Sequence, residues 1–253
     1  MARARTTFVV QNTIRLTDHL IRVHLGGPGF ASFQPNGFTD AYVKLAFPGA
    51  DGDTMRTYTV RAVDTAAEEI AIDFVYHGDE GVAGPWAAAA EPGDTIDLLG
   101  PGGAYAPRAD ADWHLLAGDD SALPAIAAAS EALPSDAVGR IFVEVDGPAD
   151  ELAFVHPEGV TLTWVHREGA EPGVRLAAAV RAESWLDGQA QVFIHGEAQA
   201  VMHDLRPYVR KEHGVTAEWA SISGYWRRGR TEEGFRRWKS ELAESEKSAT
   251  AAV

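Results

Sequence analysis

One short segment of the chain combines a cationic side chain with an aromatic ring at the spacing of a β-strand. It reads Arg56-Thr57-Tyr58-Thr59-Val60-Arg61. Alternate residues of a strand share a face, so Arg56 and Tyr58 would lie side by side. A guanidinium can pair with a phosphate while the ring stacks on a flat ligand. The segment therefore indicates a site for a nucleotide-like molecule, although an ordinary edge strand with exposed Arg and Tyr would use the same residue types.

A second segment has the small residues of an anion-binding helix start. Gly81-Val82-Ala83-Gly84-Pro85-Trp86 leads into an alanine run over 87–90 that favours helix. Backbone N–H groups at such a start can donate hydrogen bonds to a diphosphate. A plain turn with a helix cap explains the same residues. His77, at the end of the preceding strand, is either a ligand-facing group or a hydrogen-bonded strand residue.

Two further segments each join a predicted strand to a predicted helix. They are Gly118-Asp119-Asp120-Ser121-Ala122-Leu123-Pro124 and His195-Gly196-Glu197. Nucleotides bind outside the carboxyl ends of the strands in open α/β sheets, at turns of this kind. The first turn lacks the Gly-x-Gly-x-x-Gly spacing, and its two aspartates would repel a diphosphate placed directly on it. Capped helix starts without a ligand are the alternative for both turns.

Three arginines and two aromatic residues stand together in Gly224-Tyr225-Trp226-Arg227-Arg228-Gly229-Arg230. Such a cluster is conspicuous in a chain whose net charge is −15. It is typical of a site for an anion or a flat ligand, and equally of a solvated basic turn. Arg236 and Lys239 extend the cluster unless they pair with neighbouring glutamates at helical spacing.

The composition of the 253-residue chain limits the classes of function. A net charge of −15 argues against nucleic acid and against an anionic membrane surface as partners. The absence of cysteine excludes disulfides, thiolate metal sites and iron–sulfur clusters, so redox chemistry would need a bound cofactor. No run of about twenty apolar residues predicts a membrane-spanning helix, and no signal peptide is recognisable. We therefore expect a soluble protein of the cytoplasm.

The pattern of short runs divides the chain into two parts. Strands are predicted in the first part over 6–10, 20–25, 41–47, 56–63, 70–77 and 95–99, which suits an antiparallel barrel. The second part alternates strands over 113–117, 140–145, 161–166 and 191–195 with helices over 123–133, 174–185 and 198–213. This alternation predicts a parallel sheet built from βαβ units. Residues 107–112 are the predicted linker, and 231–247 form a predicted C-terminal helix.

The order of these segments resembles that of the siderophore-interacting proteins, a family of ferric-siderophore reductases within the ferredoxin–NADP reductase superfamily. The similarity runs from about Phe8 to Gly234 and includes Gly100-Pro101-Gly102-Gly103. It implies an antiparallel six-stranded FAD-binding β-barrel over residues 1–106, followed by a parallel-sheet, NAD(P)H-binding α/β domain over 113–253 that ends in the C-terminal helix. Asp120-Ser121 stands where the family more often has Glu-Thr, which is a conservative difference.

Matched residue by residue, the resemblance also implies a set of binding residues. Tyr58 would stack on the flavin ring, Thr59 would meet its reactive edge, and Arg56 would pair with the diphosphate. The other FAD-binding residues would be Thr57, Asp73, Val75, His77, Gly84, Pro85, Trp86, Ala87 and Tyr225. NAD(P)H would contact Asp119, Ser121, Ala122, Gly196, Glu197 and Trp226. An anionic siderophore would meet Arg227, Arg228, Arg236 and Lys239.

The resemblance implies a reaction in which NADH or NADPH reduces bound FAD, and the electrons then reduce Fe(III) in a siderophore to Fe(II). No side chain is expected to be catalytic or to ligate a metal, since the flavin carries the chemistry. The choice between NADH and NADPH stays open, although Arg140, His166 and Arg167 near predicted strand ends could meet the extra phosphate of NADPH. Another flavin reductase of the same superfamily and a siderophore-binding protein without turnover are the alternatives. We expect a monomer.

Overall fold

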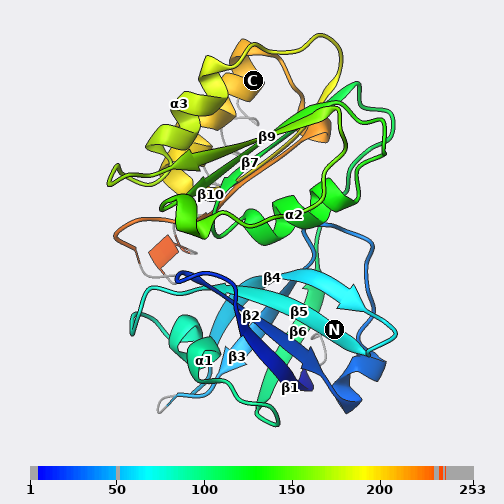
Figure 1. Cartoon of the computed structure of the whole chain (residues 1–253), viewed down its shortest axis with the longest axis vertical. Helices are drawn as coiled ribbons and strands as arrows, with labels where there is room; N and C mark the ends of the chain where they lie inside the picture. Colours follow the sequence, from blue (N-terminus) through cyan, green and yellow to red (C-terminus); the bar gives the residue numbers. More distant parts are fainter. Residues whose placement is uncertain (1–4, 50–51, 231–233, 236, 238–253) are drawn as a thin grey trace.

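The computed structural model describes residues 5–49, 52–230, 234–235 and 237, and it consists of a β-barrel joined to a parallel sheet (Figure 1). The six-stranded antiparallel barrel and the parallel sheet confirm the predicted fold class. Among these residues, no helix combines the length and the apolar character needed to cross a membrane. Most of the predicted C-terminal helix lies outside the described residues. The boundaries of the two domains stay a prediction.

The barrel closes in the order β1-β2-β5-β4-β3-β6, with antiparallel pairing between neighbours. Its strands are β1 (Thr6–Arg15), β2 (Leu20–Gly26), β3 (Tyr42–Phe47), β4 (Thr54–Asp64), β5 (Glu69–Val75) and β6 (Thr95–Gly102). Side chains alternate between the two faces of a strand, so each strand sends apolar residues such as Phe8, Leu45 and Ile72 into the interior. A 3-10 turn, η1 (Pro28–Ser32), and helix α1 (Ala83–Ala89) pack against this core.

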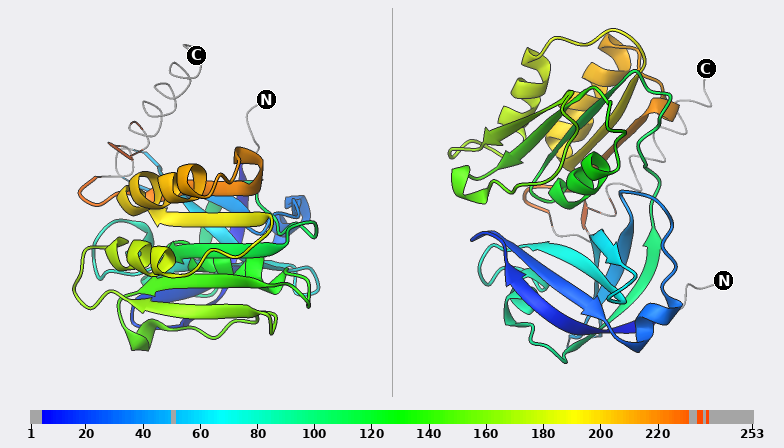
Figure 2. Two further views of the ribbon diagram at one scale, coloured as in Figure 1. Left: turned by 90° about the horizontal axis from the view of Figure 1, so that it is seen from above. Right: turned by 45° about the vertical axis from the view of Figure 1, so that its right-hand side comes forward.

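The second half is a five-stranded parallel sheet in the order β11-β10-β7-β8-β9. Its strands are β7 (Trp113–Asp119), β8 (Gly139–Val145), β9 (Val160–His166), β10 (Ala190–Glu197) and β11 (Ala220–Trp226). Helix α2 (Leu123–Glu131) covers the face toward the barrel (Figure 2). The other face is covered by α3 (Val174–Ala182) and two π-helical segments, η3 (Ala200–Leu205) and η4 (Tyr208–Glu212). The 3-10 turns η2 (Pro148–Asp150) and η5 (Ala217–Trp219) lie in loops.

Two elements of the sheet half differ from the sequence prediction. The helix predicted over 198–213 is present without a break over 198–212, but most of it is π-helical, with α-helical residues at 198–199 and at Arg206-Pro207. Pro207 lacks the N–H that a regular α-helix would use at this position, which fits the departure from α-helical bonding. Strand β11 was not predicted, because its residues alternate only weakly in polarity and the arginines that follow it indicated a turn. The segment 224–226 is therefore strand, and the basic turn begins at Arg227.

The barrel and the sheet share one buried cluster of side chains. Leu20 of β2 and Tyr105, which follows β6, pack in the same core as Phe193 of β10. Outside this core, Arg61 of β4 and Glu131 of α2 form a two-pronged ion pair with distances of 2.5 and 2.9 Å. These contacts hold α2 and the neighbouring strand ends of the sheet next to the barrel.

Candidate functional site

The carboxyl ends of β7 and β10 form the topological switch point of the parallel sheet. From β7 the chain continues through β8 to β9 on one side, whereas β10 and β11 lie on the other. Crevices at such points bind nucleotides in open α/β sheets. His195 of β10 pairs with Gly118 of β7, so the turns that follow these two residues are adjacent. The structure thus brings together the two turns that were predicted to bind NAD(P)H.

Asp119 is a buried carboxylate on which both turns converge. It accepts hydrogen bonds from the backbone N–H (3.0 Å) and Oγ (2.5 Å) of Ser121, from Glu197 N–H (2.8 Å) and from Trp226 Nε1 (2.8 Å). A Cβ atom at Gly196 would lie 2.7 Å from Asp119 Oδ2, so this position requires glycine. Burial, followed by the nearby Asp120, raises the pKa of Asp119 to about 7, although its hydrogen bonds act in the opposite direction. The side chain ties the ends of β7, β10 and β11 together.

Glu197, the second acidic residue at the switch point, is also engaged within the fold. Its carboxylate accepts hydrogen bonds from the backbone N–H groups of Gln199 (2.6 Å), Ala200 (3.0 Å) and Arg228 (3.3 Å). Ala122, another residue predicted to bind NAD(P)H, is fully buried at the start of α2. These side chains hold the two turns in place. The turns would therefore offer a nucleotide their backbone rather than an uncompensated charge.

On the barrel, the residues of β4 that were predicted to bind FAD lie beside a group of aromatic rings. The Tyr58 ring lies 4.5 Å from that of Phe74, which lies 5.6 Å from that of Trp86. Tyr58 and Arg56 are half-buried and share a strand face, whereas Thr57 is exposed. A partly accessible ring and a guanidinium on one face fit a flat heterocycle that carries phosphate groups.

Tyr225, at the end of β11, packs against the buried cluster that the barrel and the sheet share. Thr59 lies on the opposite face of β4 from Arg56 and Tyr58. Thr59 is 8% exposed, and burial is the main reason that the pKa of Tyr225 is raised above its usual value. The Tyr225 ring meets His195 edge to face at 4.7 Å, and His195 stacks on Phe193 at 4.0 Å. Tyr225, predicted to face the flavin, therefore lies next to the switch point, on the face of the sheet toward the barrel.

Asp73, predicted to lie beside the flavin, forms a buried ion pair that was not predicted. Arg22 donates to its two carboxylate oxygens through Nε (2.6 Å) and Nη2 (2.8 Å). The two residues face each other across β2 and β5, and the hydrogen bonds to Asp73 raise the pKa of Arg22. A lone arginine in an apolar strand is a visible clue, but its partner depends on the strand register, which the sequence does not show.

The predicted diphosphate-binding residues lie in α1 and in the loop before it. Gly84 packs closely on β5, because a Cβ atom there would lie 3.2 Å from the carbonyl oxygen of Val75. Ala87 is fully buried in the barrel core. Pro85 and Trp86 are half-buried and His77 is exposed. Gly84 and Ala87 thus serve the packing of α1, which leaves the rings of Pro85 and Trp86 for contact with a ligand.

The residues predicted to bind substrate lie directly after β11. Arg227 donates to Gln199 Oε1 at 3.5 Å, and the exposed Arg228 forms an ion pair with Glu171. Arg236 and Lys239 lie outside the described residues. Arg227 and Arg228 follow Trp226 at the end of β11, so they lie next to the switch point.

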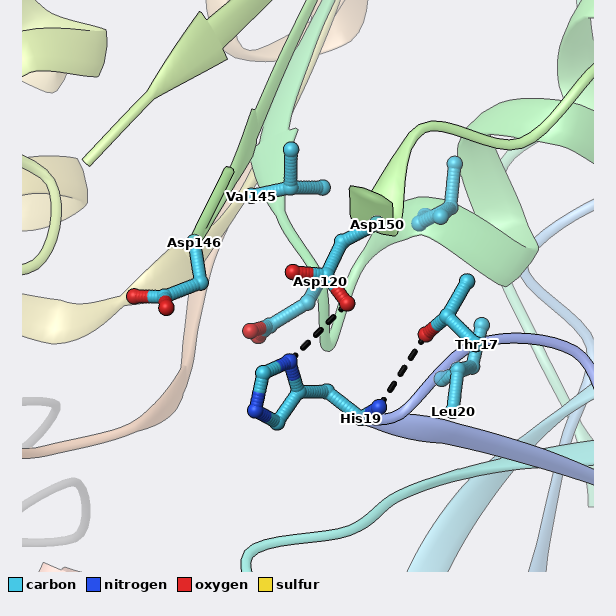
Figure 3. A pocket seen from close by; sticks show the side chains of 8 residues that line it. Thr17, His19, Leu20, Asp120, Val145, Asp146 and Asp150 are labelled. Carbon is cyan, nitrogen blue, oxygen red and sulfur yellow. Dashed lines mark hydrogen bonds and ion pairs between the residues drawn. The ribbon is translucent and has the colours of Figure 1, made fainter. Parts of the chain in front are cut away.

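A pocket that was not predicted lies on the other side of the switch point, between the turn after β1 and the ends of β7 and β8 (Figure 3). It is lined by Thr17, His19, Leu20, Asp120, Leu123, Val145, Asp146 and Asp150. His19 Nδ1 and Asp150 Oδ1 lie 2.9 Å apart and connect the barrel to η2. The lining residues come from segments that are far apart in the chain, so no local motif reveals the pocket.

Both halves of the chain match models of one protein family. Residues 48–105 match the siderophore-interacting FAD-binding domain, and residues 111–229 match the siderophore-interacting protein. An uncharacterized protein of Mycobacterium tuberculosis is 56% identical, over 94% of this chain and 96% of its own. Ferric vibriobactin reductase ViuB of Vibrio cholerae is 33% identical, over 87% of this chain and 88% of its own.

A solved structure has the same arrangement of barrel and sheet. The crystal structure of a siderophore utilization protein from T. fusca has a TM-score of 0.83 and 37% sequence identity to this chain. The match covers 91% of this chain and 95% of that one. Together with the family models and the curated relatives, this likeness shows that the chain belongs to the siderophore-interacting protein family.

Proposed function

We propose that this chain is an FAD-containing oxidoreductase that uses NADH or NADPH to reduce Fe(III) held by a siderophore. The observation that carries the proposal is the position of Tyr225, which packs against His195 and against the buried cluster shared by the barrel and the sheet. This packing places the switch point of the sheet next to the barrel. A ring held on the barrel and a nicotinamide held in the crevice would therefore be neighbours, as hydride transfer requires.

The barrel residues have the chemistry needed to hold FAD. Tyr58 would stack on the flavin ring, Arg56 would pair with the diphosphate, and Trp86 would add a second aromatic contact. Tyr225 would screen the ring from water on the side of the sheet. When bound, FAD converts the two electrons of a nicotinamide into single-electron steps, which iron requires. The match of residues 48–105 to an FAD-binding domain supports this assignment.

The sheet residues would position the electron donor. The hydrogen bonds of Asp119 fix the Gly196 turn and the Trp226 ring in place. The turn and the ring are therefore already ordered before the nucleotide binds, so less conformational entropy is lost on binding. The two turns would then hold NAD(P)H with its nicotinamide toward Tyr225.

The assignment of a ferric siderophore as the substrate depends mainly on the similarity to the relatives. By its name, the ViuB protein acts on ferric vibriobactin, and this chain shares its length and family. Fe(II) binds hard oxygen donors more weakly than Fe(III), so reduction would loosen the siderophore. Arg227 and Arg228 would attract an anionic siderophore to the crevice, with Arg236 and Lys239 extending the positive surface. Since NAD(P)H is a cytoplasmic reductant, we expect the protein to act there, as a monomer.

An absorbance spectrum provides the first test of the proposed function. The purified protein, supplied with FAD, should bind it in a one-to-one ratio and show the flavin bands. NADH or NADPH should bleach these bands under anaerobic conditions. A protein that stays colourless after reconstitution with FAD would rule out the flavoenzyme and favour a siderophore-binding protein without turnover. A protein that is bleached but reduces added free flavin, and no ferric siderophore, would instead be another flavin reductase.

A further inference from the structure

Four ring side chains form a row on the face of the parallel sheet that lies toward the barrel. Tyr105, which follows β6, packs on Phe193 of β10 with ring centroids 4.8 Å apart. Phe193 stacks on His195 at 4.0 Å, and His195 meets Tyr225 of β11 edge to face at 4.7 Å. The row therefore ends on the ring that is predicted to face the flavin.

His195 is held on two sides within this row. It is only 4% exposed, and its Nε2 atom lies 2.9 Å from the Oγ atom of Ser221 on β11. The plane of its imidazole is within 17° of the Phe193 plane, as in a stacked pair. Close packing and a hydrogen bond together leave a buried ring few alternative orientations. His195 therefore offers Tyr225 a fixed surface.

The backbone next to Tyr225 is confined as well. A Cβ atom at Gly224 would lie 2.7 Å from the Cβ atom of Ala198, so the chain passes too close to Ala198 for any side chain at this position. The main freedom left to Tyr225 is rotation of its side chain. Its ring crosses the His195 plane at 63°, an edge-to-face arrangement that aromatic rings favour. The contact with His195 therefore limits the angle at which the tyrosine ring stands.

The next residue, Trp226, is held by a different side chain. Its Nε1 atom donates a hydrogen bond to Asp119 at 2.8 Å. A change at His195 would therefore remove the support of Tyr225 and leave the hydrogen bond of Trp226 in place. The two aromatic residues at the end of β11 can thus be perturbed separately.

We infer that His195 is a positioning residue, which sets the orientation of the Tyr225 ring and thereby the fit of that ring against bound FAD. Ser221 acts one step further away, by fixing His195. The inference rests on the proposed function, in which Tyr225 covers the flavin. Because His195 would act only through Tyr225, its effect should vanish when the tyrosine ring is absent.

The test is a double-mutant cycle with His195→Ala and Tyr225→Ala, alone and together. Fluorescence titration of each apoprotein with FAD gives the dissociation constant, and the fluorescence of the bound flavin reports how closely a quenching tyrosine ring approaches it. His195→Phe keeps a ring beside Tyr225. His114→Ala is the matched control, because His114 is also buried, with 3% exposure, but lies at the amino end of β7.

His195→Ala should weaken FAD binding by about threefold to tenfold and make the bound flavin more fluorescent. His195→Phe should retain most of the affinity, and Tyr225→Ala should bind FAD equally well with and without His195→Ala. Ser221→Ala, which leaves every ring in place, should cause a smaller loss that also vanishes without Tyr225.

Losses that add in the double variant, or an equal loss in His114→Ala, would overturn the inference and leave the proposed function in place. Full FAD affinity in both His195→Ala and Ser221→Ala would overturn it in the same way. A wild-type apoprotein that binds no FAD would overturn the proposed function and this inference together.

Discussion

Asp119 shows how one buried residue can hold the ends of several strands of a parallel sheet together. Its carboxylate receives donors from Ser121, Glu197 and Trp226, which belong to three different parts of the sheet edge. The pKa of this group is raised to about 7, mainly by burial. The carboxyl is therefore more easily protonated in the folded protein than in the unfolded chain, where its pKa is about 3.8.

We expect Asp119→Asn to lower the free energy of unfolding by roughly 1–3 kcal/mol, because an amide NH₂ group would face the N–H donors of Glu197 and Trp226. The folded wild type holds an extra proton between about pH 4 and 7, so the stability contributed by Asp119 decreases as pH rises through this window. Urea unfolding should therefore show a larger difference between wild type and variant at pH 5 than at pH 8. An equal difference at the two pH values would contradict the raised pKa.

Tyr58 is the residue on which the flavin assignment depends most. We expect Tyr58→Ala to weaken FAD binding by about tenfold or more, because the variant loses the ring that would stack on the flavin. Fluorescence titration of the apoprotein with FAD measures the effect. Phe30→Ala is the matched control, since Phe30 is also a half-buried aromatic residue packed on the barrel core. Unchanged FAD affinity in Tyr58→Ala would exclude the stacking role.

At the scale of elements, β2 and β5 are joined by the ion pair between Arg22 and Asp73. The Asp73 carboxylate is only 2% exposed, so removing its partner would leave a buried charge. We expect Arg22→Met to lower the free energy of unfolding by about 3–5 kcal/mol, and the double change Arg22→Met with Asp73→Leu to recover most of the loss. Denaturant titrations check both values.

A matched control for this pair is Arg175→Met on α3. The side chains of Arg175 and Glu168 are 44% and 62% exposed, so this variant should lose less than about 1 kcal/mol. Similar losses of unfolding free energy in Arg22→Met and Arg175→Met would contradict this account. So would a double variant that is no more stable than Arg22→Met.

The elements also show what the sequence can and cannot predict. The run of β-branched and aromatic residues in β5 and the alanine-rich runs of α1 and α2 predict these elements directly, because each depends on local residue preference alone. The partner of Arg22 could not be predicted, since it depends on strand register. The acidic pocket near Asp146 could not be predicted for a related reason. Its residues come together only when the turn after β1 packs on the sheet. β11 was not predicted because its segment is short and alternates only weakly in polarity. It forms a strand by pairing with β10, and this pairing is not visible in the sequence.

The site residues were predicted as groups, and the structure refines what each group does. Tyr58 and Tyr225 were predicted to face one flavin although they are separated by most of the chain, and that shared role stays a prediction. Tyr225 packs against the buried cluster that the barrel and the sheet share. Asp119 and Glu197, which were predicted to contact NAD(P)H, accept hydrogen bonds from the surrounding backbone. These bonds could not be predicted from the sequence, because they depend on how the ends of β7 and β10 pack together, and the contacts with NAD(P)H stay a prediction.

At the scale of the whole molecule, a strongly acidic protein must still attract an anionic iron chelate. The net charge is −15, and the described arginines after β11 place a small positive region at the crevice. We expect Arg227→Glu to raise the KM for an anionic ferric siderophore by about threefold to tenfold with little change in kcat, and the effect should shrink at high salt. Steady-state assays at two ionic strengths measure it.

The control for this effect is Arg181→Glu. Arg181 pairs with Glu212 at the end of α3, so the variant makes the same change in net charge away from the crevice. It should leave the KM unchanged. Equal increases in the two variants would assign the effect to overall charge rather than to a local binding surface.

The most direct test of the claim that this chain reduces ferric siderophores follows electron transfer from the reduced flavin to iron in a single turnover. FAD-loaded protein is reduced anaerobically with a limiting amount of dithionite and mixed rapidly with a ferric siderophore in the presence of a ferrous chelator. The account predicts that the flavin bands return as the ferrous chelate forms, with two ferrous ions for each flavin reoxidised. A flavin that stays reduced while the ferric siderophore remains intact would contradict it.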